Sequence, residues 1–385
     1  MDGARVPAEW ARSRPCRATW IRASEGRMKR SMFLLLLLLS VSLSHAQSDA
    51  GGEEAAGEEE HVELFTTPTT KMAAATSDFG YNLFRALARS NPTANIFLSP
   101  ISVSAVLTQL SLGASAHAQS QLFRALRYHN LQDAGLHNTL KDLLASLRSG
   151  AKGLSYAARI YLARRLRLKQ DFFQLVEQQY GVRPKPLQGG SKDLKEINDW
   201  VSQQTDAKVQ RFLSKPLPRN SGVNTVSASY FKGKWVTRFG QTGVMDNFQL
   251  DSGASVRVPM MQQDNYPVKM GVDPDLRCTV ALSLPTLRLS YSTDLLPLLG
   301  DIGLAEWLAN TDLERISLQP AKLSSVNHKV VLETAPEGNQ YPSTATTAHS
   351  LSYRVDRPFL FLIRDESSGA LLFIGQVVNP KDLTM

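Results

Sequence analysis

Residues 95–114 of the chain read NIFLSPISVSAVLTQLSLGA and carry strong local structural signals. Ser99 followed by Pro100 is a combination that begins many helices, because serine caps free backbone N–H groups and proline fits the first helical turn. The apolar residues that follow predict a helix from Pro100 to about residue 112.

Around this helix, helical patterns predominate in the first half of the chain and strand patterns in the second half. Apolar spacing predicts further helices at 72–89, within 118–148, and at 170–180, 193–213 and 294–308. Strands are expected at 154–168, 223–232, 248–250, 256–261, 266–270, 277–283, 326–332, 351–363 and 369–378. Helices and strands that do not alternate strictly indicate an α+β fold.

The N-terminal region has the features of a secretory signal. Lys29 and Arg30 precede an apolar run at 32–39, and small residues lie two apart in Ser44-His45-Ala46. The uncharged stretch, 31–46, is shorter than the ~20 residues that span a bilayer, so we expect a cleaved signal rather than the alternative, an uncut anchor. The predicted divisions are an upstream, non-native extension at 1–27, a signal peptide at 28–46, an acidic disordered leader at 47–70 and a folded domain at 71–385.

Composition and motifs argue against an enzyme. The chain has 385 residues, a formal charge of +8 and only two cysteines, which excludes a disulfide scaffold or a cysteine-rich zinc module. It contains no G-x-S-x-G, H-E-x-x-H, G-x-G-x-x-G, Walker A or C-x-x-C motif. The seven histidines are scattered without i, i+4 pairs. We therefore expect no catalytic residues, no metal site and no cofactor.

A cluster of basic residues is the strongest candidate for binding. It comprises Arg159, Arg164, Arg165, Arg167 and Lys169. If 154–168 is one strand, its period of two places Arg165, Arg167 and Lys169 on one face, at a spacing of roughly 6–7 Å. Such a row suits a polyanion, and for a secreted protein a sulfated glycosaminoglycan is expected before nucleic acid. The alternative is a solvated strand face that prevents edge pairing.

Several separated motifs resemble the serpin family. They are residues 95–114, YFKGKW at 230–235, VPMM at 258–261, VDRPFLF at 355–361, GALLFIG at 369–375 and Asn379-Pro380. The resemblance covers about 71–380 in collinear order. It implies a serpin fold of three β-sheets with eight or nine helices and an exposed reactive-centre-type loop, which matches the long segment 334–350.

The resemblance also implies an internal deletion near Ser283. In serpins, strand 3 of sheet B, helices G and H and strand 2 of sheet C separate two strands that here adjoin directly. These elements come to roughly 50 residues. Because their loss would remove core side chains, we expect a splice variant or mis-joined gene that folds poorly.

The loop hinge departs from the pattern of inhibitory serpins, in which the loop inserts into the central sheet after cleavage. The hinge residues are Glu337, Gly338, Asn339, Gln340, Tyr341 and Pro342. Inhibitors carry threonine and a run of alanines here, whereas Pro342 lacks the N–H that a central strand needs. The sequence therefore predicts a non-inhibitory serpin, with a serine-protease inhibitor as the alternative.

The closest resemblance within the family, to a non-inhibitory member, implies particular binding sites. Its heparin-contacting residues correspond to Arg164, Arg165 and Arg167, and its collagen-contacting acids correspond, more weakly, to Asp273 and Asp275. It implies a monomeric protein of the extracellular space that binds heparin-like chains, collagen and a cell-surface receptor, with anti-angiogenic and neurotrophic signalling. No nucleic-acid partner and no membrane span are expected.

Overall fold

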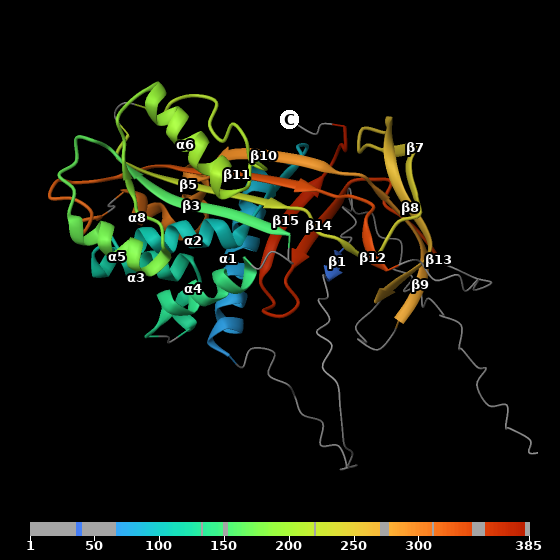
Figure 1. The fold of residues 1–385 in the computed structure, drawn as a ribbon, viewed down its shortest axis with the longest axis horizontal. Coiled ribbons are helices and arrows are strands. Elements are labelled where there is room, and N and C mark those ends of the chain that lie inside the picture. The colour runs from blue at the N-terminus through green and yellow to red at the C-terminus, as the bar shows by residue number, and fades with distance from the viewer. Residues whose placement is uncertain are drawn as a thin grey trace, which may run out of the picture.

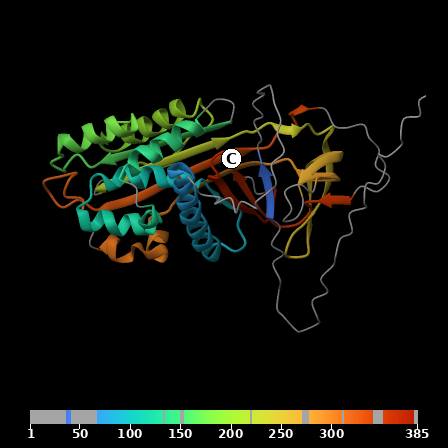
Figure 2. The same ribbon diagram turned by 90° about the horizontal axis from the view of Figure 1, so that it is seen from below.

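The computed structural model describes residues 36–40, 67–131, 134–148, 153–218, 221–269, 277–309, 312–340 and 351–381. A long five-stranded sheet runs through the molecule, with helices gathered around one end of it (Figures 1 and 2). The other end of this sheet meets two smaller sheets (Figure 1).

The first two helices form where the sequence predicts them. α1 (Pro68–Ser90) begins four residues earlier than expected, because Thr67 and Thr70 form a reciprocal capping box and Pro68 fits the first turn. α2 (Pro100–Ser111) has the predicted start, and all of its residues are buried. It packs on α1 and on two strands of the long sheet, so it forms the centre of the core.

Two of the later predicted helices end early or break. The other helices are α3 (Ala116–Ala125), a 3-10 turn (Tyr128–Asn130), α4 (Leu136–Leu147), α5 (Gln170–Tyr180), α6 (Ser191–Gln204), α7 (Leu296–Leu299), a π-helical turn (Gly300–Leu304) and α8 (Ala305–Ala309). α6 stops well before residue 213 because Asp206 and Ala207 adopt left-handed φ angles of 48° and 59°. Gly303, with φ of 97°, interrupts the helix expected at 294–308. Within the described residues, no helix has the length and apolarity that crossing a membrane requires.

The five-stranded sheet has the strand order β10-β11-β5-β3-β4. Its strands are β10 (Arg288–Asp294), β11 (Leu323–Glu333), β5 (Val223–Phe231), β3 (Leu154–Leu162) and β4 (Lys185–Pro186). β11 and β5 pair in parallel from Leu323 opposite Val223 to Leu332 opposite Phe231. β11 and β5 are therefore paired directly with each other along their length, and we call this junction the seam.

Three further sheets complete the fold. The first has the strand order β13 (Leu351–Arg354), β9 (Arg277–Pro285), β8 (Ser255–Lys269), β7 (Gln241–Gln249). The second has the order β1 (Leu36–Ser40), β14 (Phe359–Arg364), β15 (Leu371–Val377), β2 (Ile96–Leu98). The third is small and pairs β12 (Gly338–Gln340) with β6 (Trp235–Thr237). The single strand expected at 351–363 is thus two strands in different sheets. β1, which lies inside the predicted signal peptide, pairs in parallel with β14.

The chain passes from β9 to β10, and so from one sheet to another, through only Thr286 and Leu287. Backbone bonds fix this join: the Thr286 N–H donates to the Pro259 carbonyl at 2.9 Å, and the Leu287 N–H donates to Thr334 Oγ1 at 2.7 Å. This join lies close to Ser283, where the sequence predicts an internal deletion. The deletion itself stays a prediction.

A buried histidine ties the seam to α2. The Ser99 N–H at the start of α2 donates to His328 Nε2 at 3.1 Å, and His328 Nδ1 lies 2.8 Å from Ser227 Oγ on β5. Because Nε2 accepts a hydrogen bond, the proton of the neutral ring is on Nδ1. Complete burial lowers the pKa of His328 to about 3, and a hydrogen bond to the backbone of Ser227 opposes this shift only in part.

This burial predicts a loss of stability in mild acid. His328 stays neutral in the folded chain but binds a proton near pH 6.5 when unfolded, so its contribution is complete above pH 6.5 and is lost as the pH falls towards 3. Urea unfolding between pH 6 and 4 should show that His328→Gln reduces the dependence of stability on pH by about 1.4 kcal/mol per pH unit. The exposed His117→Gln is the control and should keep the original slope; equal slopes in all three proteins would contradict this role for His328.

Candidate functional site

The basic cluster predicted to lie on a strand forms a turn instead. β3 ends at Leu162, so the expected row of Arg165, Arg167 and Lys169 on one strand face is wrong. The Ala163 N–H still bonds to the Gly222 carbonyl at 2.8 Å, but the Gly222 N–H donates to Ser324 Oγ instead of returning a bond to β3, and the chain then turns. We call residues 163–169 the basic turn.

The basic turn is anchored by its apolar residues and by backbone bonds. The Leu166 N–H donates to the Ala163 carbonyl at 3.1 Å, and both side chains are buried. The Leu318 N–H donates to the Arg167 carbonyl at 2.9 Å, and the Lys169 N–H donates to the Ile316 carbonyl at 2.9 Å. These anchors leave Arg164, Arg165 and Arg167 exposed on a fixed backbone, with no acidic residue between 163 and 170.

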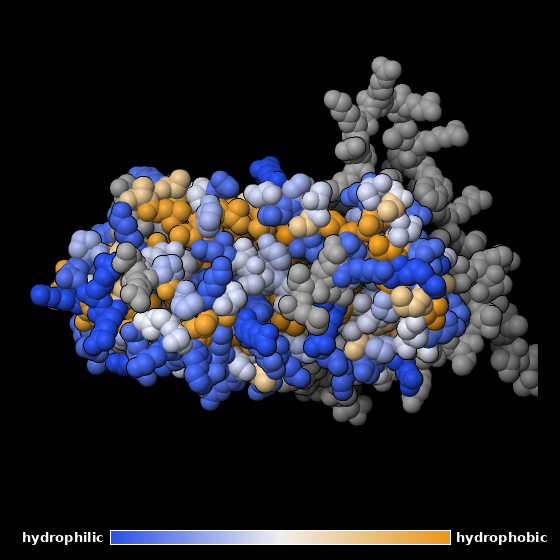
Figure 3. Space-filling view, turned by 90° about the horizontal axis from the view of Figure 1, so that it is seen from above, coloured by the Kyte–Doolittle hydropathy of each residue, from blue (hydrophilic) through white to orange (hydrophobic). Residues whose placement is uncertain are grey.

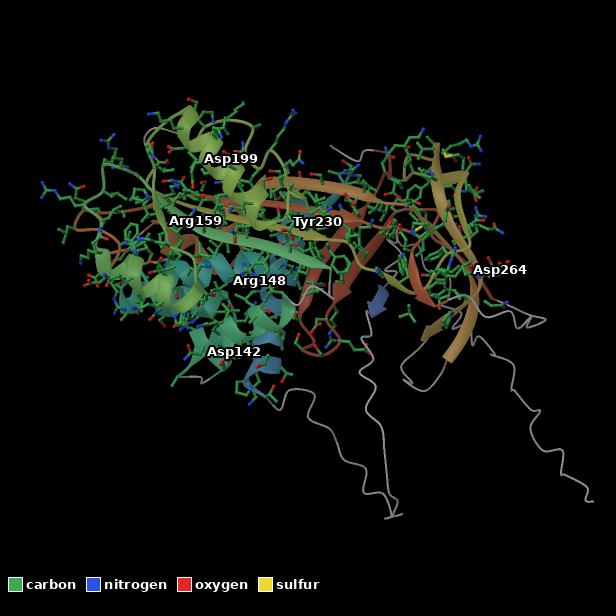
Figure 4. The ribbon with its side chains drawn as sticks, in the orientation of Figure 1. Asp142, Arg148, Arg159, Asp199, Tyr230 and Asp264 are labelled. Carbon is green, nitrogen blue, oxygen red and sulfur yellow. The ribbon has the colours of Figure 1, made fainter. Side chains whose placement is uncertain are left out.

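Arg159, which the sequence groups with the cluster, has a structural role. Its guanidinium lies 3.4 Å from Glu196 Oε1, donates to the Arg183 carbonyl at 2.8 Å, and stacks 4.9 Å from the Trp200 ring. Its side chain is only 15% exposed. Figure 4 places Arg159 on β3 below α6, the helix that carries Asp199. Arg159 is therefore enclosed by packing and is not part of an exposed cationic surface.

Four further lysines, Lys152, Lys185, Lys192 and Lys195, would extend the cluster only if the fold brought them close to it. Lys185 pairs with Glu196 at 2.6 Å, Lys195 pairs with Asp199, and Lys152 lies outside the described residues. Lys192 is exposed near the start of α6. Figure 3 shows hydrophilic residues over most of the face seen from above, interrupted by a band of hydrophobic ones, so single cations on this side are ordinary solvated residues.

The loop hinge is held away from the seam. After β11 the chain turns aside and Gly338–Gln340 pair with β6. The Trp235 N–H donates to the Glu337 carbonyl at 3.1 Å, and Trp235 Nε1 donates to the Ala335 carbonyl at 2.6 Å. Trp235 ends the motif YFKGKW, and this position was the sequence signal that could have identified it as an anchor of the hinge.

Gly338 is required by this anchoring, since an added Cβ would lie 2.3 Å from the Arg238 backbone nitrogen. Glu337 is exposed, whereas the predicted hinge residues Tyr341 and Pro342 lie outside the described part of the chain, as do the predicted collagen-contacting Asp273 and Asp275. Within the described residues, no group of His, Cys, Asp and Glu could hold a metal ion.

The basic turn and the hinge lie at opposite ends of the long sheet. β5 follows directly after Gly222, which bonds to the basic turn, and its parallel partner β11 starts beside it. β11 has 11 residues, which at about 3.3 Å each predict a separation of about 35 Å from the hinge. The basic turn and the described hinge residues 337–340 are therefore separate surfaces.

The packing of Arg159 predicts that its loss affects stability and leaves polyanion binding intact. Arg159→Ala removes a partly buried ion pair and a stacked guanidinium, so we expect urea unfolding to show a loss of about 1–3 kcal/mol. Retention on a heparin column should not change. Arg183→Ala, which removes an exposed ion pair to Glu177, is the control and should cost less than about 1 kcal/mol. Lower heparin retention at unchanged stability would refute the structural assignment of Arg159.

Comparison with known proteins gives the family. The sequence profile described as "Serpin (serine protease inhibitor)" matches residues 74–281 and 272–380. The chain is 34% identical to pigment epithelium-derived factor of Bos taurus over 411 aligned positions, which cover 90% of this chain and 99% of the relative. The human factor is 32% identical, covering 84% and 90%, and alpha-2-antiplasmin of Bos taurus is 32% identical, covering 83% and 75%.

Solved structures agree on the fold. Human glycosylated kallistatin superimposes with a TM-score of 0.73 at 24% identity, covering 82% of this chain and 99% of that structure. Mouse protein-Z dependent protease inhibitor gives 0.72 at 23% identity, covering 81% and 98%. The resemblance expected from the sequence motifs, including that to pigment epithelium-derived factor, is confirmed, and the chain belongs to the serpin family and has the serpin fold.

Proposed function

We propose that this serpin is a secreted, non-inhibitory protein that acts outside the cell by binding other molecules. Heparin-like glycosaminoglycans bind at Arg164, Arg165 and Arg167, a cell-surface receptor and collagen are further partners, and the signalling output is of the anti-angiogenic and neurotrophic type. Serpins are not catalytic enzymes, so the open question for this chain is whether it traps proteases.

The exposed arginines of the basic turn are the single observation that carries this proposal. Three guanidinium groups stand on a backbone fixed by buried leucine and alanine side chains, and no acid lies among them. Arginine matches the planar geometry of sulfate and carboxylate groups through paired N–H donors. A repeating polyanion can therefore contact several of these groups at once.

The composition of the hinge supports the non-inhibitory assignment. For the loop to insert, the seam must open and residues 339–342 must enter a central sheet position. Pro342 has no N–H to donate there, and Asn339 would be buried with its amide unpaired, at a cost of about 1–3 kcal/mol. Insertion of this loop is therefore opposed by its own sequence.

Removing the arginines should weaken heparin binding. Three exposed charge contacts contribute up to about 1 kcal/mol each, so Arg164→Ala/Arg165→Ala/Arg167→Ala should reduce affinity for heparin by about 10- to 100-fold at low salt. Isothermal titration at several salt concentrations measures this change and should also show a weaker dependence on salt.

The matched control replaces three exposed cations on other helices. Arg85→Ala, Arg89→Ala and Lys141→Ala on α1 and α4 change the net charge by the same amount. This variant should keep at least a third of the original affinity. Equal losses in the two triple variants would show that only net charge matters and would remove the proposed site.

Cleavage of the loop should leave thermal stability nearly unchanged. An inserted strand adds several backbone hydrogen bonds at about 1 kcal/mol each, which predicts a rise of more than about 10 °C in the melting temperature. Because Pro342 and Asn339 oppose insertion, we expect limited proteolysis within 341–350 to change the melting temperature by less than about 3 °C.

A repaired hinge provides the control for this measurement. Asn339→Thr, Gln340→Ala, Tyr341→Ala and Pro342→Ala together restore the residue types of an inhibitory hinge, so the cleaved variant should show the large rise. A large rise in the unaltered chain, or a covalent complex with a serine protease on a denaturing gel, would favour the inhibitory alternative.

A further inference from the structure

An apolar cavity lies beside the join between β9 and β10. It contains about 760 Å³ of empty space, counting the solvent at its mouth. Its walls come from the long sheet, from the strands β8 and β9, and from β14, and they include Trp235, Met261, Leu284, Leu287, Leu332 and Phe361. Trp235 adds a wall from β6, so strands of four sheets line the cavity. Figure 1 shows how these sheets are arranged.

The walls of this cavity are held apart by the backbone. Leu284 belongs to one sheet and Leu287 leads into another, so neither can move towards the other without breaking a ladder. The Thr334 N–H donates to the Leu287 carbonyl at 2.9 Å, and Thr334 Oγ1 accepts the Leu287 N–H at 2.7 Å. A cavity between fixed sheets persists because its surroundings relax only partly.

The polar groups of the lining are already engaged. Glu333 Oε1 lies 3.3 Å from Arg288 Nε, and Glu333 Oε2 accepts the Tyr230 hydroxyl at 3.2 Å. Trp235 Nε1 donates to the Ala335 carbonyl, and Lys234 is exposed. The interior therefore offers chiefly apolar and aromatic surface, and the one cation in its lining, Lys234, is exposed to solvent.

We propose that this cavity is a binding site for a small, uncharged apolar ligand of the hydrocarbon or aromatic class. Water gains little in such a space because it lacks hydrogen-bond partners, whereas an apolar molecule fills it and makes dispersion contacts with every wall. An apolar and aromatic lining of this kind is typical of ligand pockets in proteins. This site is separate from the basic turn, so either proposal can fail alone.

Binding can be measured with the neutral fluorescent probe N-phenyl-1-naphthylamine and the purified full chain. We expect saturable binding of one probe per chain, energy transfer from Trp235 to the probe, and displacement by p-xylene. The melting temperature should rise by a few degrees at saturating probe, since the ligand binds only the folded chain.

Filling the cavity should abolish binding. Leu287→Trp places an indole in the empty space, and we expect probe affinity to fall at least tenfold, while Leu175→Trp on the exposed surface of α5 should leave it unchanged. Met261→Phe is a second filling variant for the case in which Leu287→Trp does not fold. Binding of many probes per chain, binding unaffected by both filling variants or by p-xylene, or the absence of a cooperative melt would each overturn the proposal.

Discussion

The bonds made by one neutral imidazole hold the centre of this serpin together. His328 on β11 accepts the Ser99 N–H that begins α2 and bonds to Ser227 on β5, so it joins the buried helix to both strands of the seam. A ring so enclosed cannot carry a proton without losing the Ser99 bond. These two bonds add side-chain links to the parallel pairing of β11 with β5 and fix the start of α2 against the closed central sheet.

The closed seam separates two regions with different roles. At one end, β3 gives way to a turn whose leucine and alanine are buried and whose arginines are exposed. At the other end, Trp235 holds Ala335 and Glu337 so that the hinge pairs with β6 rather than with β5. About 35 Å of strand lies between the two regions. The residues proposed to bind a polyanion are therefore different from those that hold the hinge against β6.

Local patterns in the sequence identified the family, most helices and the seam strands, because burial and helical periodicity act over short distances. They failed after Leu162, where the Leu166 N–H bonds back to the Ala163 carbonyl in a turn although the residues could have continued the strand. They also failed at Asp206 and Ala207, whose left-handed φ angles end α6 early and are uncommon for these residue types. In the sequence, Arg159 cannot be distinguished from the neighbouring exposed arginines. Its structural role becomes visible only through contacts with Glu196 and Trp200, which are distant in sequence.

The pairing of β1 with β14 bears on the proposal that the chain is secreted and loses its signal peptide. Residues 36–40 lie within the segment that a signal peptidase would remove, and they are the neighbour of β14 on its outer side. Their removal would leave a row of backbone N–H and carbonyl groups without partners along β14. An edge strand without a partner can pair with a strand of another chain. Removal of the signal peptide would therefore expose a sheet edge at which two molecules could associate.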